Sequence, residues 1–147
     1  MENNEISRNQ EHELIMTAMY DALVYIALKE EFSLESILEG IYNKPYEEVP
    51  SYSKEVLIKS LAHINDIITA FEKNMVNWRF SRLNNIIQAI LITSYTKCKY
   101  LDLPTDKKVV IDLAVRLTKK FAEPHDYKFV NAILDNTLWI IPLPSAV

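Results

Sequence analysis

Apolar residues recur along most of this chain at spacings of three and four positions, the period of a helix with one buried face. Two such stripes stand close together near the carboxy end. Their members are Val109, Val110, Leu113, Ala114, Leu117 and Phe121 in the first, and Phe129, Val130, Ile133 and Leu134 in the second. Pro124 and Asp126 separate them, because proline disfavours helical geometry in the residue before it and Asp is a good helix cap. We therefore expect two helices that meet at a tight corner, the second beginning near Asp126.

The rest of the chain also predicts helices. Apolar stripes indicate a first helix through residues 14–26, a short one through 34–41 capped by Ser33, a long one through 57–71 and another through 83–95. The proline-containing segment 44–52 is typical of a loop, and residues 74–80 form a connection. No strand-like alternation of useful length occurs. The predicted fold class is all-α.

Composition narrows the possible functions. The chain has 147 residues, 49% of them hydrophobic, which suits one domain or two closely packed subdomains. The single glycine, Gly40, excludes glycine-rich phosphate loops and glycine-based nucleophile elbows. Cys98 permits no internal disulfide, and His12, His63 and His125 are too dispersed for metal-ligand spacing. We expect a protein that works by binding, without catalysis, metal or cofactor.

The expected cellular location follows from two features that the sequence lacks, a membrane span and a secretory signal. No run approaches the roughly 18 apolar residues of a membrane span. The polar and acidic start, MENNEISRNQEHE, is unlike a secretory signal. We expect a cytoplasmic protein with no membrane partner.

Two segments carry a resemblance to a known family. IDLAVRLTKKF at 111–121, followed by KFVNAILD at 128–135, resembles the carboxy-terminal signature of the NusB antitermination factors. WRFSRLNNIIQAILITSYTKCKYLDLP at 78–104 resembles that family's Trp and Arg-Leu entry into an apolar helix. The resemblance implies a single NusB-like domain, a bundle of about seven helices. In it an amino-terminal three-helix part, about 1–73, packs on a carboxy-terminal four-helix part, about 74–147.

The resemblance also implies a function. NusB-like factors are bacterial, RNA- and protein-binding transcription factors in antitermination and termination control. They act with the ribosomal protein NusE on boxA-type single-stranded RNA, at the RNA polymerase elongation complex. Some members pair, so a homodimer is possible. The alternative is a diverged protein-interaction or ribosome-assembly factor with weak or no RNA binding.

The amino-terminal arm carries little positive charge. In the family an arginine-rich segment precedes an Ala-Leu-Tyr-like string, whose counterpart here ends at Tyr20. The positions that the family fills with arginines hold Arg8, Asn9, Gln10 and His12. Phosphate neutralisation supplies most of the affinity for RNA. We therefore expect no strong RNA binding through this arm.

Charge is distributed unevenly between the two ends. Residues 1–48 contain eleven Asp and Glu against three Lys and Arg, whereas residues 49–147 contain nine against thirteen. An acidic front repels RNA but attracts a basic protein. The basic residues of segment 97–120 are Lys97, Lys99, Lys107, Lys108, Arg116, Lys119 and Lys120. This cluster is the better candidate RNA surface, although lysines at helix ends also complement the helix dipole.

The candidate contacts form two sets. The RNA-binding candidates are Arg8, His12, Tyr20, Lys97, Lys99, Lys107 and Lys108. The partner-binding candidates are Tyr20, His125, Lys128 and Phe129. Packing in the core is the alternative for Tyr20 and Phe129. The apolar tail 139–147 either covers the core or docks on a partner, and the sequence leaves both open.

Overall fold

The computed structural model describes residues 6–138, and the tail 139–147 lies outside this range. Within it the chain forms seven α-helices, two short 3-10 helices and no strand, which confirms the all-α class. The elements are α1 (Arg8–Ala27), α2 (Leu34–Tyr42), η1 (Tyr46–Glu48), α3 (Ser51–Ala62), α4 (Ile64–Glu72), η2 (Phe80–Arg82), α5 (Asn85–Lys99), α6 (Lys107–Phe121) and α7 (Asp126–Leu138).

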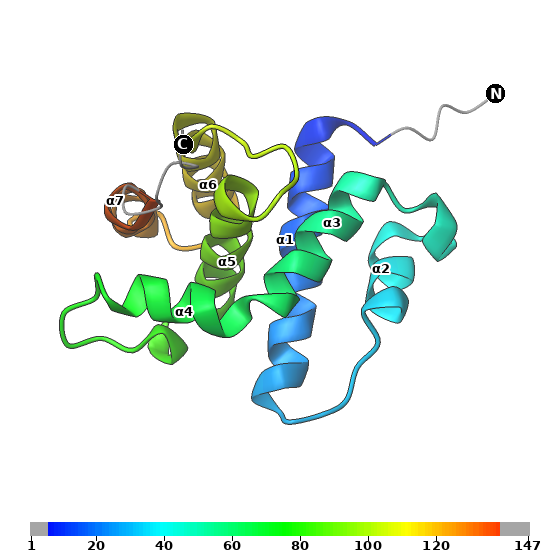
Figure 1. Ribbon diagram of the computed structural model, residues 1–147, viewed down its shortest axis with the longest axis horizontal. Coiled ribbons are helices and arrows are strands. Elements are labelled where there is room, and N and C mark those ends of the chain that lie inside the picture. Colours follow the sequence, from blue (N-terminus) through cyan, green and yellow to red (C-terminus); the bar gives the residue numbers. More distant parts are fainter. Residues whose placement is uncertain (1–5, 139–147) are drawn as a thin grey trace, which may run out of the picture.

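Helix α5 lies at the centre of the bundle (Figure 1). It contacts α1, α3, α4, α6 and α7, while α2 packs on α1. Every α5 residue from 87 to 97 is therefore buried, polar ones included. The hydroxyls of Thr93 and Thr96 donate to the carbonyl oxygens of Ala89 and Ile92 at 2.8 and 3.1 Å, which satisfies them inside the core.

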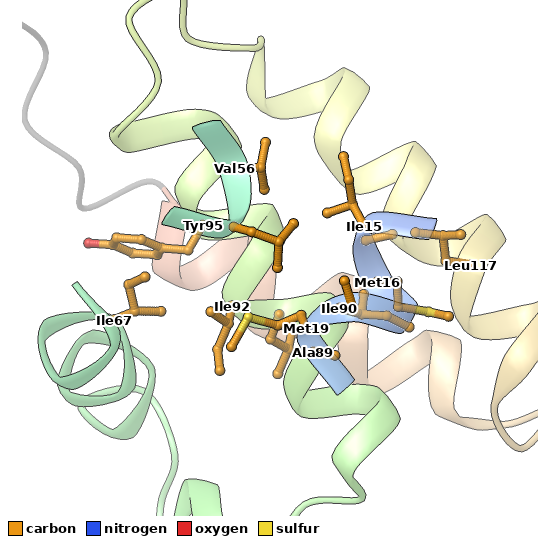
Figure 2. Close-up of a cluster of buried hydrophobic side chains, with 14 of the residues drawn as sticks. Ile15, Met16, Met19, Val56, Ile67, Ala89, Ile90, Ile92, Tyr95 and Leu117 are labelled. Atoms are coloured by element: carbon orange, nitrogen blue, oxygen red, sulfur yellow. The ribbon is translucent and has the colours of Figure 1, made fainter. Parts of the chain in front are cut away.

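The core draws side chains from all seven α-helices, and Figure 2 shows part of it. Ile15, Met16 and Met19 of α1 meet Ala89, Ile90 and Ile92 of α5, with Val56, Ile67 and Leu117 supplied by α3, α4 and α6. Burial of these apolar surfaces is the main stabilising contribution to such a bundle. One continuous core thus fixes the helices that carry the candidate contacts.

Local capping explains where several helices begin. The Ser33 hydroxyl accepts a hydrogen bond from Ser36 N at 3.2 Å, so the predicted cap of the short second helix is confirmed. That helix ends at Asn43, whose φ of 54° lies in the left-handed region that asparagine tolerates. Asn84 caps α5 in the same way, accepting from Ile86 N at 2.7 Å.

The single long helix predicted through residues 57–71 is wrong. The chain leaves helical geometry at His63, with φ −112° and ψ 15°, and divides into α3 and α4. The His63 ring stacks on Tyr100 with centroids 3.9 Å apart. The bend turns α4 toward α5, where Ile67 and Phe71 are fully buried. Because both helices bury apolar residues, the stripe continues across the bend and gives no sign of it.

The predicted corner between residues 121 and 126 is confirmed, with two corrections. Asp126 lies in the first turn of α7, and its carboxylate accepts a hydrogen bond from the backbone N–H of Glu123 at 3.3 Å. Val109, Phe121 and Phe129 were counted in apolar stripes, but all three side chains are exposed. The buried stripes are therefore narrower than the sequence pattern suggested.

Two properties of the described range bear on function. No helix between residues 6 and 138 is long and apolar enough to cross a membrane. In the same range no three His, Cys, Asp or Glu side chains gather in a way that could hold a metal ion.

Candidate nucleic-acid and partner interface

The start of α1 carries the one arginine of the amino-terminal arm. Ser7 and Gln10 form a reciprocal capping box, with Gln10 N donating to Ser7 Oγ at 3.2 Å and Ser7 N to Gln10 Oε1 at 3.1 Å. Arg8 Nη1 lies 3.3 Å from Glu11 Oε1, and its guanidinium is 4.6 Å from the centre of the Tyr52 ring. The Arg8 side chain stays 64% exposed. It is accessible, but Glu11 neutralises part of its charge.

His12 lies half-buried one turn further along α1. Its ring packs edge-on against Tyr52, with centroids 5.7 Å apart. Burial, helped by the positive charges of Lys97, Arg8 and Arg116, lowers its pKa to about 3. The imidazole is therefore neutral near pH 7 and adds no cation to an RNA surface. Its Nδ1 is buried with no hydrogen-bond partner among the described residues.

A polar network lies beneath the arm. Tyr42 Oη donates to Ser53 Oγ at 2.7 Å, and Ser53 Oγ donates to Glu11 Oε2 at 2.8 Å. These bonds join α1, α2 and α3 through buried groups. The network holds the first turn of α1 in a fixed position, because buried polar groups are costly to leave unpaired.

Lys97 belongs to this interior and not to the surface. Only 2% of the residue is exposed, so its place in the predicted RNA surface is corrected. Burial lowers the pKa of its amine to about 7, against Cys98 and Glu11, which raise it. The reason is the central position of α5, which is enclosed by neighbouring helices along this stretch.

Helix α6 brings further cations to the start of α1. Arg116 Nη1 donates to Asn9 Oδ1 at 3.3 Å, and Lys120 forms an ion pair with Glu13. The two helices enclose a small pocket of about 150 Å³ at these contacts. Arg8 and Arg116 thus both lie near His12, whose pKa their charges lower.

The remaining predicted lysines lie elsewhere. Lys107 forms an ion pair with Asp135 of α7 at 3.0 Å. Lys99 lines a pocket between α4, α5 and α7. Lys108 is exposed in the first turn of α6. The predicted RNA residues therefore do not form one patch.

The partner-binding candidates are accessible. Tyr20 of α1 is 36% exposed, and Phe129 of α7 is exposed to a similar degree. His125 and Lys128 are exposed at the corner that precedes α7 and in its first turn. Helix α5 lies between α1 and α7 (Figure 1), so Tyr20 and this corner belong to separate parts of the molecule.

Comparison with known proteins assigns the chain to a family. The sequence model of the NusB family matches residues 51–138, more than half of the chain. The chain belongs to the NusB family. A Treponema denticola protein named transcription antitermination protein NusB is 35% identical over 85 residues, which cover 58% of this chain and 62% of that protein. Its Macrococcus caseolyticus namesake is 30% identical over 108 residues, covering 74% of this chain and 80% of that protein.

The structural comparison supports the NusB fold. A solved structure of T. maritima NusB superposes with a TM-score of 0.71, covering 94% of this chain and 95% of the other, at 21% sequence identity. The predicted NusB-like bundle is therefore confirmed. In sequence, the matched segments span less than two thirds of the T. denticola protein and of the Finegoldia magna NusB, of which 63% is covered.

Two residues of this NusB-family chain were missing from the predicted contacts. Arg116 and Lys120 join the arm only through contacts with Asn9 and Glu13, each 107 positions away in sequence. The one sequence signal was their place in the basic segment 97–120. Sequence spacing alone could not pair them with the start of α1.

Proposed function

We propose that this protein acts in transcription antitermination, binding boxA-type single-stranded RNA together with the ribosomal protein NusE at elongating RNA polymerase. The observation that carries the proposal is membership of the NusB family, whose curated relatives bear the name transcription antitermination protein. The all-helical NusB fold supports it.

On this chain the first proposed RNA contacts lie where the start of α1 meets the second half of α6. Arg8 and Arg116 supply permanent charge, and Tyr20 supplies an exposed ring on which a base can stack. Lys99, Lys107 and Lys108 stay in the proposal as separate contacts. His12 contributes an uncharged ring, because burial keeps it neutral. Lys97 is withdrawn because it is buried.

The proposed contacts with NusE are Tyr20 and the corner of α7 formed by His125, Lys128 and Phe129. Their exposure supports this assignment. An exposed Phe flanked by a cation suits the edge of a protein interface, where aromatic residues and polar groups are mixed.

Fluorescence anisotropy tests the RNA half of the proposal. Labelled boxA-like RNA is titrated with the protein, with and without NusE, and compared with a scrambled RNA of equal length. We expect tighter binding to the boxA-like RNA, further tightened by NusE. Equal affinity for both RNAs under both conditions would overturn sequence-specific RNA binding.

A second candidate function has its own support. A groove of about 410 Å³ between α1 and α2 is lined by aromatic and acidic side chains, among them Tyr25, Phe32, Asp21 and Glu31. Tyr25 and Phe32 stack with centroids 5.7 Å apart. An acidic, aromatic groove suits a basic protein segment, which supports a protein-interaction or ribosome-assembly factor that needs no RNA.

A pull-down experiment distinguishes the two proposed functions. For the interaction factor, NusE should co-purify from RNase-treated mixtures, and Glu31→Lys should weaken that capture. The control is Asp112→Lys, an equal charge change at an exposed residue of α6 that belongs neither to the groove nor to the proposed NusE corner. Equal capture by both variants would exclude the groove as the partner site.

A further inference from the structure

The connection between α4 and α5, residues 73–84, displays large side chains to solvent. We call it the Trp78 loop. It projects from the body of the bundle at the lower left of Figure 1. Val76 is 81% exposed and Trp78 is 60% exposed. A solvent-exposed tryptophan indicates a binding surface, because exposed aromatic side chains mark such surfaces more often than single exposed aliphatic ones do.

The backbone of this loop is held in place. The Glu72 carboxylate accepts a hydrogen bond from Phe80 N at 2.8 Å. The Phe80 ring is buried and stacks on Phe71 with centroids 5.7 Å apart. The side-chain amide of Asn74 donates to Thr137 Oγ1 at 3.4 Å. These anchors fix both arms of the loop, so Trp78 is presented from a rigid frame that binding need not order.

The far end of the loop is fastened as well. Gln88 of α5 donates through Nε2 to the carbonyl of Leu83 at 2.8 Å. Asn77, at the tip, has a φ of 61°, which turns the chain just before Trp78. The exposed side chains therefore owe their position to bonds within the fold.

The loop lies in a part of the chain that lacks acidic residues. Between Glu72 and Asp102 the sequence contains no Asp or Glu and five Lys and Arg. One of the five, Lys97, is buried, which leaves Lys73, Arg79, Arg82 and Lys99. Within residues 6–138, none of these four takes part in an ion pair. The loop and the adjoining end of α5 therefore carry four cations that form no ion pair among residues 6–138, with the carboxylates of Glu72 and Asp66 nearby.

Part of this charge converges on a pocket beside the loop. Lys73 and Lys99 both line a hollow of about 190 Å³ between α4, α5 and α7, with the amide of Asn74 and the phenol of Tyr95. Such a hollow offers an anion two ammonium groups and the phenol of Tyr95, whereas the Asn74 amide is already bonded to Ala70 O and Thr137 Oγ1. It adjoins the loop directly, because Lys73 and Asn74 belong to both.

We propose that the Trp78 loop and this lysine pocket bind single-stranded RNA, with a base stacked on Trp78 and phosphates contacted by the four cations. The inference rests on the proposed function and names a second RNA surface for it, on α4 and α5. Aromatic side chains that stack on bases, set among cations that follow the backbone, are the usual means of binding single strands. An acidic peptide would use the cations but would leave the indole without a planar partner.

Indole fluorescence tests the contact directly. The chain has two tryptophans, so a Trp139→Phe variant leaves Trp78 as the single reporter. This variant is titrated with the boxA-like RNA used above and with a scrambled RNA of the same length. We expect RNA to quench Trp78 emission with the same midpoint as the anisotropy titration, because stacking on a base quenches an indole.

Substitutions test the energetic role. Trp78→Ala should weaken RNA binding by about tenfold or more, the usual effect of removing one stacked base contact. Arg79→Gln with Arg82→Gln should lower the slope of log affinity against log salt by about 1.4, since each phosphate contact contributes roughly 0.7 for a single strand. Lys29→Gln is the matched control, an exposed cation on the turn after α1, and should leave the slope unchanged.

The outcomes separate this inference from the proposed function. Suppose that the wild-type protein binds RNA, that RNA leaves Trp78 emission unchanged, and that Trp78→Ala binds RNA as tightly as wild type. The loop is then not an RNA surface, and the proposed function rests on the contacts of α1 and α6 alone. If the wild-type protein binds no RNA, both fail. If Trp78→Ala weakens capture of NusE and leaves RNA affinity unchanged, the loop is a protein interface and the inference is overturned. Circular dichroism confirms that the variants fold.

Discussion

The buried amine of Lys97 should make the protein less stable at neutral pH than it would be with an apolar side chain. Burial lowers the pKa of Lys97 from 10.5 to about 7, so between these values the unfolded chain binds a proton that the folded chain does not. Stability then rises with pH across this window, and below pH 7 the full cost of burying the charge applies. At 1.36 kcal/mol per pH unit, the cost is about 5 kcal/mol at most.

The test substitutes Lys97→Met, which keeps the length of the side chain and removes the charge. We expect urea unfolding at pH 7 to show Lys97→Met more stable than wild type by about 2 to 5 kcal/mol. The gap should shrink by roughly 2 kcal/mol between pH 7 and pH 9, because the folded wild-type amine is deprotonated there while the unfolded amine keeps its proton, so wild-type stability rises with pH. Lys108→Met, at an exposed position, is the control and should show no such dependence. A variant less stable than wild type, or a gap independent of pH, would refute the reasoning.

Three further predictions concern the region around the arm and the loop. Ser53→Ala should lower the free energy of unfolding by about 1 to 3 kcal/mol in urea denaturation, because it leaves Tyr42 Oη and Glu11 buried without their shared partner. His12 should remain neutral from pH 5 to 8 in an NMR titration, and stability should fall as pH drops from 6.5 toward 3, where only the unfolded chain is protonated. Phe80→Ala should cost about 3 to 5 kcal/mol of thermal stability, because the ring is fully buried against Phe71.

Each of these predictions is checked by a control variant or by a result that would contradict it. Ser51→Ala, at an exposed position on the same helix, should leave stability almost unchanged. A His12 resonance that titrates near pH 6.5 would mean that the imidazole is solvated. A Phe80→Ala variant with unchanged thermal stability would contradict the anchoring of the Trp78 loop.

Features set by neighbouring residues were predictable from the sequence. The short helix after Ser33 and the corner after Phe121 depend on caps, prolines and apolar spacing within a few positions, and the structure confirms both. The break at His63 was not predictable, because the apolar stripe runs on through it. At the break His63 stacks on Tyr100, a residue distant in sequence.

The site was less predictable than the fold. Lys97 follows a polar stretch at the end of α5, so its sequence neighbourhood suggested a surface position. Its burial arises because α5 is surrounded by other helices, which one helical stripe cannot reveal. Arg116 reaches the start of α1 only because α1 and α6 both pack on α5. Exposure, and hence the choice of cations that can meet RNA, is decided by tertiary packing.

Read-through transcription tests the central claim most directly. A template carrying a boxA-like element upstream of a terminator is transcribed by bacterial RNA polymerase with NusE, in the presence and absence of this protein. The account predicts that the protein raises the fraction of transcripts extending past the terminator, and that scrambling the boxA-like element abolishes the increase. Equal termination with and without the protein, on both templates, would contradict a role in antitermination.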